Sequence, residues 1–255
     1  MSPSSGTKMT VTKPNMIAVD GPAASGKSTI ARGLAARLGF RYINSGAFYR
    51  ALASETLKHS VDVADLARLD VFLAAIHLDC DDEGEKCFVD GRDVTEELRG
   101  RDVTLQASVI AKIPRVREKV NEELRRLARD AHCVMDGRDI GSVVFPDANV
   151  KVYLEASPEE RARRRLKDFE AMGAGISLEQ IGREIAERDK QDSTRSVAPL
   201  RPSEGAIVYN STGRTPQEVV DQLLDLMKSK LAPGAQSRGP GARGGMADTT
   251  VNGGD

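Results

Sequence analysis

The sequence has no tryptophan, only 4% aromatic residues, and three cysteines and three histidines among its 255 residues. The cysteines, Cys80, Cys87 and Cys133, form no C-x-x-C pair, and the histidines are equally scattered. This pattern predicts neither a zinc site nor a disulfide framework, and it fits a reducing cytoplasm. No apolar run approaches the roughly 20 residues of a transmembrane helix, so we expect no membrane partner.

An excess of charge of one sign is also missing, because 37 lysines and arginines face 38 aspartates and glutamates. A balanced chain lacks the positive field that attracts nucleic acid or an anionic membrane. Few aromatic residues are present to stack on bases, so a nucleic-acid-binding role is the least favoured. Apolar residues amount to 40% of the chain, which is enough for a buried core.

The most informative segment is a glycine-rich loop between an expected strand and an expected helix. It fits G-x-x-x-x-G-K-[ST], the phosphate-binding pattern of nucleoside-triphosphate enzymes, and reads Gly21, Pro22, Ala23, Ala24, Ser25, Gly26, Lys27, Ser28, Thr29. Glycine lets backbone amides approach phosphate oxygens, and the following helix adds the positive end of its dipole. We expect Lys27 to reach the β- and γ-phosphates and the Ser28 hydroxyl to hold Mg²⁺.

Apolar segments and helical patterns alternate along the chain. Strands are expected at 16–20, 40–43, 131–135, 150–154 and 206–209. Because helices separate them, we predict an α/β fold of three layers with a five-stranded parallel sheet and right-handed crossovers. A turn is expected at Asn44–Gly46, and capping boxes are expected to open helices at Ser157–Glu160 and Thr215–Glu218.

Two regions depart from this alternation. Residues 63–106 combine a helical pattern with two short alternating strands, which predicts an inserted antiparallel subdomain. Residues 158–195 read as two polar, arginine-rich helices broken at 172–175, a pattern that favours a mobile lid over a solvated helical hairpin. The remaining boundaries are a domain at 15–231, a disordered lead-in at 1–14 and a disordered glycine-rich tail at 232–255.

The tetrapeptide Asp-Gly-Arg-Asp occurs twice, at Asp90–Asp93 and at Asp136–Asp139. The first copy lies in the insertion and is expected to form a hairpin turn. The second copy follows a buried strand, where P-loop enzymes place an acid that orders Mg²⁺ or its waters. The second copy is therefore a candidate for the site because it lies at the end of a core strand, and not because of the tetrapeptide sequence itself.

Proteins with this loop hydrolyse a nucleotide, switch between states or transfer a phosphoryl group. Asp136 is followed by Gly137, where hydrolytic motors usually carry a glutamate that polarises water, and the chain has no guanine-reading N-K-x-D motif. Transfer to a bound acceptor fits best, because it depends on positioning and on cations that stabilise the moving charge. Such cations are available at turns, helix starts and the predicted lid, namely Arg50, Arg138, Arg188 and Arg195.

Five blocks of sequence occur in a fixed order: 21–29, Asn44–Arg50, Pro114–Arg117, Asp136–Asp139 with Val144–Asp147, and Arg188–Leu200. Together they resemble the bacterial cytidylate kinases, which are P-loop nucleoside monophosphate kinases, over about Met16 to Leu231. The resemblance implies in-line phosphoryl transfer from ATP to CMP and dCMP, with ATP and Mg²⁺ as cofactors. It also implies a cytoplasmic monomer whose partners are these nucleotides and whose insertion is the monophosphate-binding subdomain.

The resemblance also implies roles for individual residues. It matches Arg50 and Arg138 to phosphate clamps, and Arg195 to a further phosphate-facing arginine. It places Ser45, Ser108, Arg117 and Asp192 at the pyrimidine, and Asp139 and Arg188 at the pentose. The catalytic residues, which would stabilise the charge of the moving phosphoryl group, would then be Lys27, Arg138, Arg188 and Arg195. One departure is Asn44, where members often have aspartate, so a charge-dependent role is not expected there.

Two alternatives stay open on the sequence. The first is a kinase of the same type for another small acceptor, such as UMP, AMP or shikimate. The second is a nucleotide-binding switch or regulatory ATPase without an acceptor, which would leave the arginines unexplained.

Overall fold

The computed structural model describes residues 14–171 and 175–231. Nearly all of the predicted lead-in, the whole predicted tail and most of the predicted break at 172–175 lie outside the described residues. Within the described part of the chain, no helix has both the length and the apolar character needed to cross a membrane.

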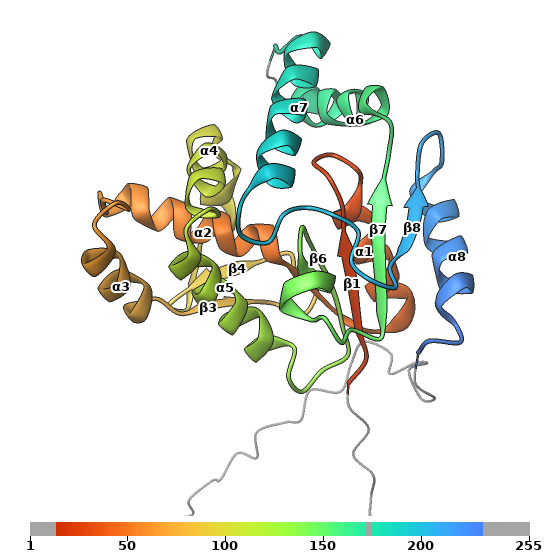
Figure 1. The fold of residues 1–255 in the computed structure, drawn as a ribbon, viewed down its shortest axis with the longest axis horizontal. Coiled ribbons are helices and arrows are strands. Elements are labelled where there is room, and N and C mark those ends of the chain that lie inside the picture. Colours follow the sequence, from red (N-terminus) through yellow and green to blue (C-terminus); the bar gives the residue numbers. More distant parts are fainter. Residues whose placement is uncertain (1–13, 172–174, 232–255) are drawn as a thin grey trace, which may run out of the picture.

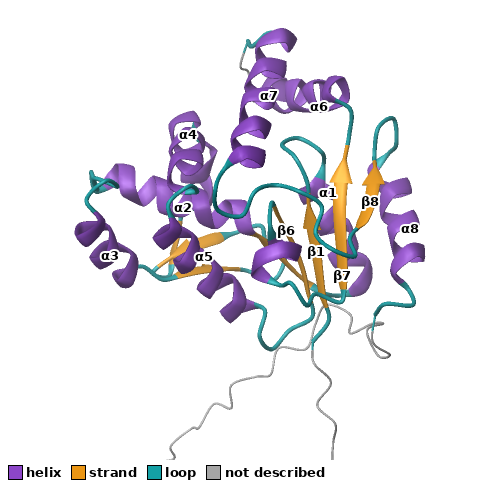
Figure 2. Ribbon diagram, in the orientation of Figure 1, coloured by secondary structure: helices purple, strands orange, loops and turns teal. Residues whose placement is uncertain are grey.

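A parallel sheet of five strands forms the centre of the fold (Figures 1 and 2). The strands lie in the order β2-β6-β1-β7-β8 and span β1 Met16–Asp20, β2 Arg41–Asn44, β6 Cys133–Gly137, β7 Val150–Glu155 and β8 Ile207–Asn210. Every neighbouring pair runs parallel, which confirms the predicted sheet. The register aligns Asp20 with Gly137, so the loops after β1 and β6 leave the same edge side by side.

Helices cover both faces of the sheet, which gives the predicted three layers. One face carries α1 Lys27–Leu38 and α8 Pro216–Met227, and the other carries α2 Ser45–Lys58 and α5 Pro114–Leu127. Successive side chains of a strand point to opposite faces, and β1 is buried at every position. Ile17 therefore packs in the cluster of α1 and α8, whereas Ala18 packs in the cluster of α2 and α5.

The predicted antiparallel insertion is present between α2 and α5. Its elements are α3 Leu66–Ala75, β3 Leu78–Cys80, β4 Cys87–Val89, β5 Arg92–Asp93, the 3-10 turn η1 Thr95–Arg99 and α4 Arg101–Ile110. The small sheet has three strands and not the two expected. Asp90 and Gly91 form the expected turn, with φ of 51° and 79°, but the next two residues pair back onto β4. The short strand β5 could not be predicted from the sequence, because two residues are too few to show the alternation of apolar and polar side chains.

Two polar helices, α6 Pro158–Ala171 and α7 Leu178–Thr194, rise above the carboxyl edge of the sheet (Figure 1). Ser157 caps α6 as expected, because its Oγ accepts from the Glu160 amide at 3.2 Å. The predicted reciprocal half of this capping box is wrong, since the Ser157 amide donates to Thr212 Oγ1 and the Glu160 carboxylate pairs with Arg164. The box at the start of α8 is complete, from Thr215 to Glu218.

The predicted turn at Asn44–Gly46 is also wrong in detail. Strand β2 ends at Asn44 and α2 begins at Ser45, so no separate turn intervenes. Asn44 Oδ1 accepts from the Ala47 amide at 3.1 Å and caps the helix. Asparagine is among the preferred N-cap residues, so Asn44 has a structural role that needs no negative charge.

Candidate active site

The glycine-rich loop leaves β1 and ends at the first turn of α1. Gly21 has φ of +151°, and a Cβ there would stand 2.2 Å from the carbonyl oxygen of Leu154, so no other residue fits. Gly26, at the N-cap of α1, has φ of +92°, which also favours glycine. The two glycines thus fix a tight loop whose helix end is open to an anion.

A hydroxyl and a carboxylate meet beside the loop. Ser28 Oγ donates to Asp136 Oδ2 at 2.8 Å, and Tyr42 OH donates to Asp136 Oδ1 at 2.7 Å. Ser28 lies in the first turn of α1, and Asp136 lies near the end of β6. Oxygen donors of this kind are the ligands that Mg²⁺ prefers, so the residues fit a magnesium site. Tyr42, which the sequence reading missed, orients the carboxylate.

Lys27 lies at the centre of a group of cations. It is 5% exposed, and its Nζ donates to the carbonyl of Pro22 at 2.5 Å and to Ser25 Oγ at 3.4 Å. Burial lowers the pKa of Lys27 well below its usual value, and the charges of Arg138 and Arg188 lower it further. An anion placed beside this ammonium group would offset both effects.

Arg50 and Arg188 belong to the same group. Burial, followed by the repulsion of Arg138, lowers the pKa of Arg188 to about 10. Burial also lowers the pKa of Arg50, and Arg138 contributes to that shift as well. The charge of Arg138, at the end of β6, therefore acts on three cations from other elements, namely Lys27 of α1, Arg50 of α2 and Arg188 of α7. Such crowding of cations is typical of a site that binds several phosphate groups.

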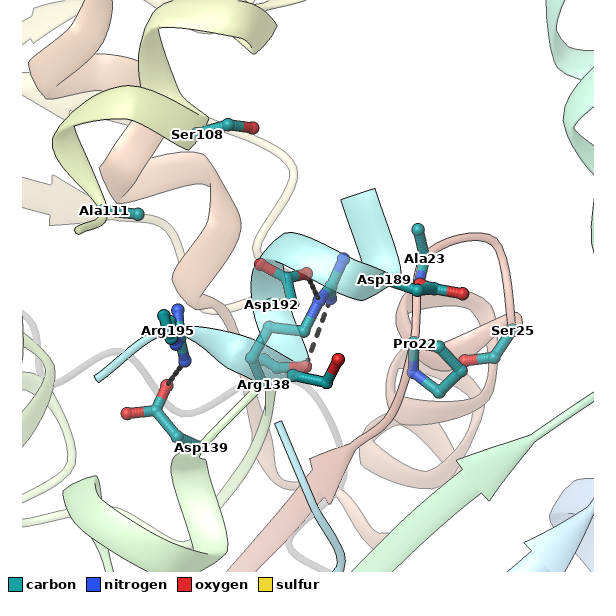
Figure 3. A network of polar contacts seen from close by, with 12 residues as sticks. Pro22, Ala23, Ser25, Ser108, Ala111, Arg138, Asp139, Asp189, Asp192 and Arg195 are labelled. Atoms are coloured by element: carbon teal, nitrogen blue, oxygen red, sulfur yellow. Dashed lines mark hydrogen bonds and ion pairs between the residues drawn. The ribbon is translucent and has the colours of Figure 1, made fainter. Parts of the chain in front are cut away.

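Two carboxylates hold the remaining predicted arginines in place (Figure 3). Arg138 Nε donates to Asp192 Oδ2 at 2.9 Å. Asp139 forms ion pairs with both Arg117 and Arg195, and Arg195 Nη2 lies 3.4 Å from Asp139 Oδ1. Burial raises the pKa of Asp139, and the charges of Arg117 and Arg195 oppose the shift. Arg195 therefore joins the site through its ion pair with Asp139.

Arg117 of α5 carries a charge, yet the structure buries it to 3% exposure. Its guanidinium lies 5.8 Å from the ring centroid of Tyr49, and Nη1 donates to the Ala111 carbonyl at 3.3 Å. Pairing with Asp139 makes this burial possible, because a buried charge needs a partner. The periodicity of α5 alone cannot reveal that contact.

The two predicted serines differ in position. Ser45 Oγ donates to the Asp136 carbonyl at 2.7 Å, next to the carboxylate of the same residue. Ser108 Oγ donates to the Thr104 carbonyl one turn back in α4, at 3.3 Å. Figure 3 shows Ser108 on the wall of the insertion, away from the Arg138 and Asp139 group. The structure therefore brings Ser45 to the loop but leaves Ser108 at the far side.

Two cavities adjoin this group. One, of about 400 Å³, is lined by Pro22 of the loop and by residues at the ends of β7 and β8 and on α7. The other, of about 410 Å³, lies between α2, the small sheet and α7, and includes Arg50 and Arg188. The cation group thus opens into the second cavity through Arg50 and Arg188, whereas the first cavity lies beside the glycine loop. Two separate cavities suit two ligands.

The protein-family model for cytidylate kinase matches residues 17–229 of this chain. The chain belongs to the cytidylate kinase family. A cytidylate kinase of Pelotomaculum thermopropionicum is 45% identical over 212 residues, which cover 82% of this chain and 93% of that protein. Those of Bacillus pumilus and Vibrio cholerae are 46% and 44% identical and cover 82% and 85% of this chain, and 94% and 97% of their own lengths.

Two carboxylates that the sequence reading missed brace the site of this cytidylate kinase family member. Asp20, the last residue of β1, accepts from the amides of Ile140 and Gly141 at 2.8 Å each and so fixes the start of the π-helical turn η2 Ile140–Val144. Burial raises the pKa of Asp20 to about 6. An acid at the end of a buried strand was the available signal, as at Asp136.

Asp189 of α7 is the second such carboxylate. Its Oδ1 accepts from the Ala23 amide at 3.1 Å, and its Oδ2 pairs with Arg161 of α6. Arg161 Nη1 also donates to the Ala23 carbonyl at 3.1 Å. One carboxylate therefore ties both helices to the phosphate loop, as Figure 3 shows for Asp189 and Ala23.

Proposed function

We propose that this protein transfers the γ-phosphoryl group of ATP to CMP and dCMP, giving CDP and dCDP. Membership of the cytidylate kinase family supports the reaction, since relatives named cytidylate kinase match this chain over most of both lengths. The observation that carries the proposal is the meeting of Lys27, Arg50, Arg138 and Arg188 from four separate elements beside one glycine loop.

Phosphoryl transfer leaves little covalent chemistry to the protein, so catalysis rests on positioning and on stabilising charge. Arg138 and Arg188 lie close enough to Lys27 to lower its pKa. We assign these three cations to the migrating group, with Arg195 as a further phosphate contact. The loop from Gly21 to Thr29 would cradle the triphosphate of ATP. Mg²⁺, held by Ser28 with Asp136, would neutralise phosphate charge when bound.

We assign the acceptor to the cavity that contains Arg50, because a phosphate monoester needs guanidinium clamps. Arg50 and Arg138 would bind its phosphate, and Asp139 with Arg188 its pentose. Ser45, Ser108, Arg117 and Asp192 would read the cytosine, whose amino group donates and whose ring atoms accept hydrogen bonds. The ion pairs of Arg138 with Asp192 and of Arg117 with Asp139 support this, since they hold these groups ready before the acceptor binds.

Ser108 requires a movement in this scheme. Its hydroxyl bonds within α4, and α4 packs on α2. Arg101 of α4 reaches Glu184 of α7 at 3.3 Å, so the insertion and the lid helices already touch across the acceptor cavity. We infer that a further movement of the insertion, beyond this contact, brings Ser108 toward the base. The protein is proposed to act as a cytoplasmic monomer on free nucleotides.

A panel of acceptors in a coupled ATP-consumption assay tests the proposal. We expect kcat/KM to be highest for CMP and dCMP, and lower by at least about tenfold for UMP, AMP and shikimate. If AMP were as good an acceptor as CMP, the assignment to cytosine would be wrong. Slow ATP hydrolysis that no acceptor stimulates would instead indicate a switch or a regulatory ATPase.

A further inference from the structure

Two of the three cysteines lie directly opposite each other in the small sheet. Cys80 ends β3, Cys87 begins β4, and the antiparallel register pairs these two residues. The Asp81 amide donates to the Lys86 carbonyl at 3.4 Å, which identifies the cysteines as a non-hydrogen-bonded pair. In such pairs the Cα atoms are about 4.5 Å apart and the side chains are closest. A disulfide accepts Cα separations from about 4.4 Å, so a bridge needs only a small tightening of the backbone.

Both cysteines line the cavity to which we assign the acceptor. Cys80 and Cys87 line this cavity of about 410 Å³ together with Arg50 and Arg188, although they are 8% and 3% exposed overall. Arg41 Nη2 lies 3.9 Å from Cys80 Sγ, and the charge of Arg50 acts on Cys87. A small anionic reagent that enters the cavity is therefore drawn to both sulfur atoms.

We propose that Cys80 and Cys87 form a reversible dithiol–disulfide site in the wall of the acceptor cavity, oxidised by small anionic disulfides. The thiolate of Cys80, the more exposed residue, attacks one sulfur of the reagent and releases one small thiol. The thiolate of Cys87 then attacks the mixed disulfide at the Cys80 sulfur and releases the second small thiol. Two protein thiols are oxidised, one external disulfide is reduced to two thiols, and the two protons pass to the released thiolates.

The rate of this exchange is set by the fraction of thiolate. Burial raises the pKa of Cys80 to about 11 and that of Cys87 to about 12. Asp79 and Asp81 add to the shift of Cys80, and Cys80, Asp93 and Asp79 add to that of Cys87. Arg41 opposes the shift at Cys80, and Arg50 opposes it at Cys87. The thiolate is the attacking form, so the reaction is slow at pH 7 and accelerates as the pH rises toward 9. Cys133, with a pKa raised to about 12, lies in the fully buried strand β6. The charge of Cys80 acts on it, but it does not line the cavity, so it serves as the internal control.

The bridge changes the shape of the cavity. Directly opposed Cβ atoms lie about 4.5–5.5 Å apart, whereas a disulfide brings them to about 3.8 Å. The hairpin must therefore tighten, and β4 packs on α2, which carries Arg50. We expect weaker acceptor binding with little change at the glycine loop, a consequence that rests on the proposed function. Formation of the bond itself does not depend on that function.

The test treats the full-length protein with 3,3′-dithiodipropionate at pH 8.5 and counts free thiols with mass mapping. We expect the wild type to lose two thiols, with Cys80 joined to Cys87, and Cys133→Ala to behave in the same way. Cys87→Ala should stop at a mixed disulfide on Cys80. Cystamine, a cationic disulfide, should react at least about fivefold more slowly because the cavity is lined by arginines. Equal reaction of all three cysteines, or a bond to Cys133, would overturn the proposal.

Kinetics separate this proposal from the proposed function. The oxidised wild type should show a KM for CMP raised several-fold, with the KM for ATP unchanged within twofold, and dithiothreitol should restore it. Saturating CMP should slow bond formation. Suppose that the bond forms, that CMP does not slow its formation and that the KM for CMP is unchanged by oxidation. The dithiol site is then correct, but its location in the wall of the acceptor cavity is wrong. If the wild type forms no bond, the dithiol site is wrong whatever the acceptor panel shows.

Discussion

Replacement of Asp139 by asparagine tests two roles of this carboxylate, namely its contribution to the stability of the fold and its contribution to acceptor binding. The carboxylate pairs with Arg117 and Arg195, and all three side chains are at most 7% exposed. Asp139→Asn keeps the shape but leaves two guanidinium groups without their counter-charge. Removing one partner of a buried ion pair costs about 3–5 kcal/mol. Arg117 keeps the Ala111 carbonyl and Arg195 keeps the Ala198 carbonyl, so we expect the lower end, about 3 kcal/mol.

A loss of this size should lower Tm by about 6–12 °C, and a urea titration measures the free energy directly. The matched control is Asp221→Asn, which breaks an ion pair with Arg37 between side chains that are 50% and 52% exposed. Exposed pairs contribute about 0–1 kcal/mol, so the control should unfold almost as the wild type does. Equal unfolding free energies for the two variants would refute the reasoning that Asp139 neutralises two buried arginines.

The same variant reports on the acceptor. Asp139 is assigned to the pentose, so Asp139→Asn should raise the KM for CMP and dCMP while the KM for ATP stays close to that of the wild type. This is measured below the unfolding transition, where the variant is folded. A large change in the KM for ATP would contradict the placement of Asp139 beside the acceptor.

Three further predictions concern the loop, the lid and Asp20. Lys27→Ala should abolish transfer, because it removes the buried cation beside the migrating group; turnover near the wild-type rate would reject that role. Arg188→Ala should lower kcat by a factor on the order of 10³. Arg183→Ala, on the exposed side of the same helix, is the control and should leave kcat unchanged. An effect of Arg188→Ala confined to the KM for CMP would make Arg188 a binding residue. The pKa of Asp20, raised from 3.8 to about 6, makes its contribution to stability fully present below pH 3.8 and lost as the pH rises through 6. Relative to Asp20→Asn, the wild type should therefore lose up to about 3 kcal/mol of unfolding free energy between pH 3.8 and pH 7, and a flat difference would show that burial does not perturb this group.

The central sheet and the phosphate loop were predictable because their signals are local. Apolar runs, helical spacing and two glycines lie within short stretches, and the structure bears them out at 16–20 and at 21–29. Strand β5 was missed because two residues carry no period. The start of α2 was misplaced because asparagine and glycine favour both turns and helix caps.

The polar contacts of the site were less accessible to sequence reasoning. Asp189 meets the Ala23 amide across 166 residues, and Tyr42 meets Asp136 across 94. Nothing in the periodicity of α5 shows that Arg117 turns inward to Asp139. Such pairs are set by the sheet order, which brings the ends of distant strands and helices together. The roles of the individual residues stay predictions, and the variants above test them.

The most direct measurement of the central claim is the stoichiometry of the products formed from ATP and CMP. Nucleotides separated by ion-exchange chromatography should show ADP and CDP appearing one for one, with no ADP above background when CMP is left out. The converging cations would then serve transfer between two nucleotides. ADP and free phosphate formed at the same rate with and without CMP, and no CDP, would contradict the account.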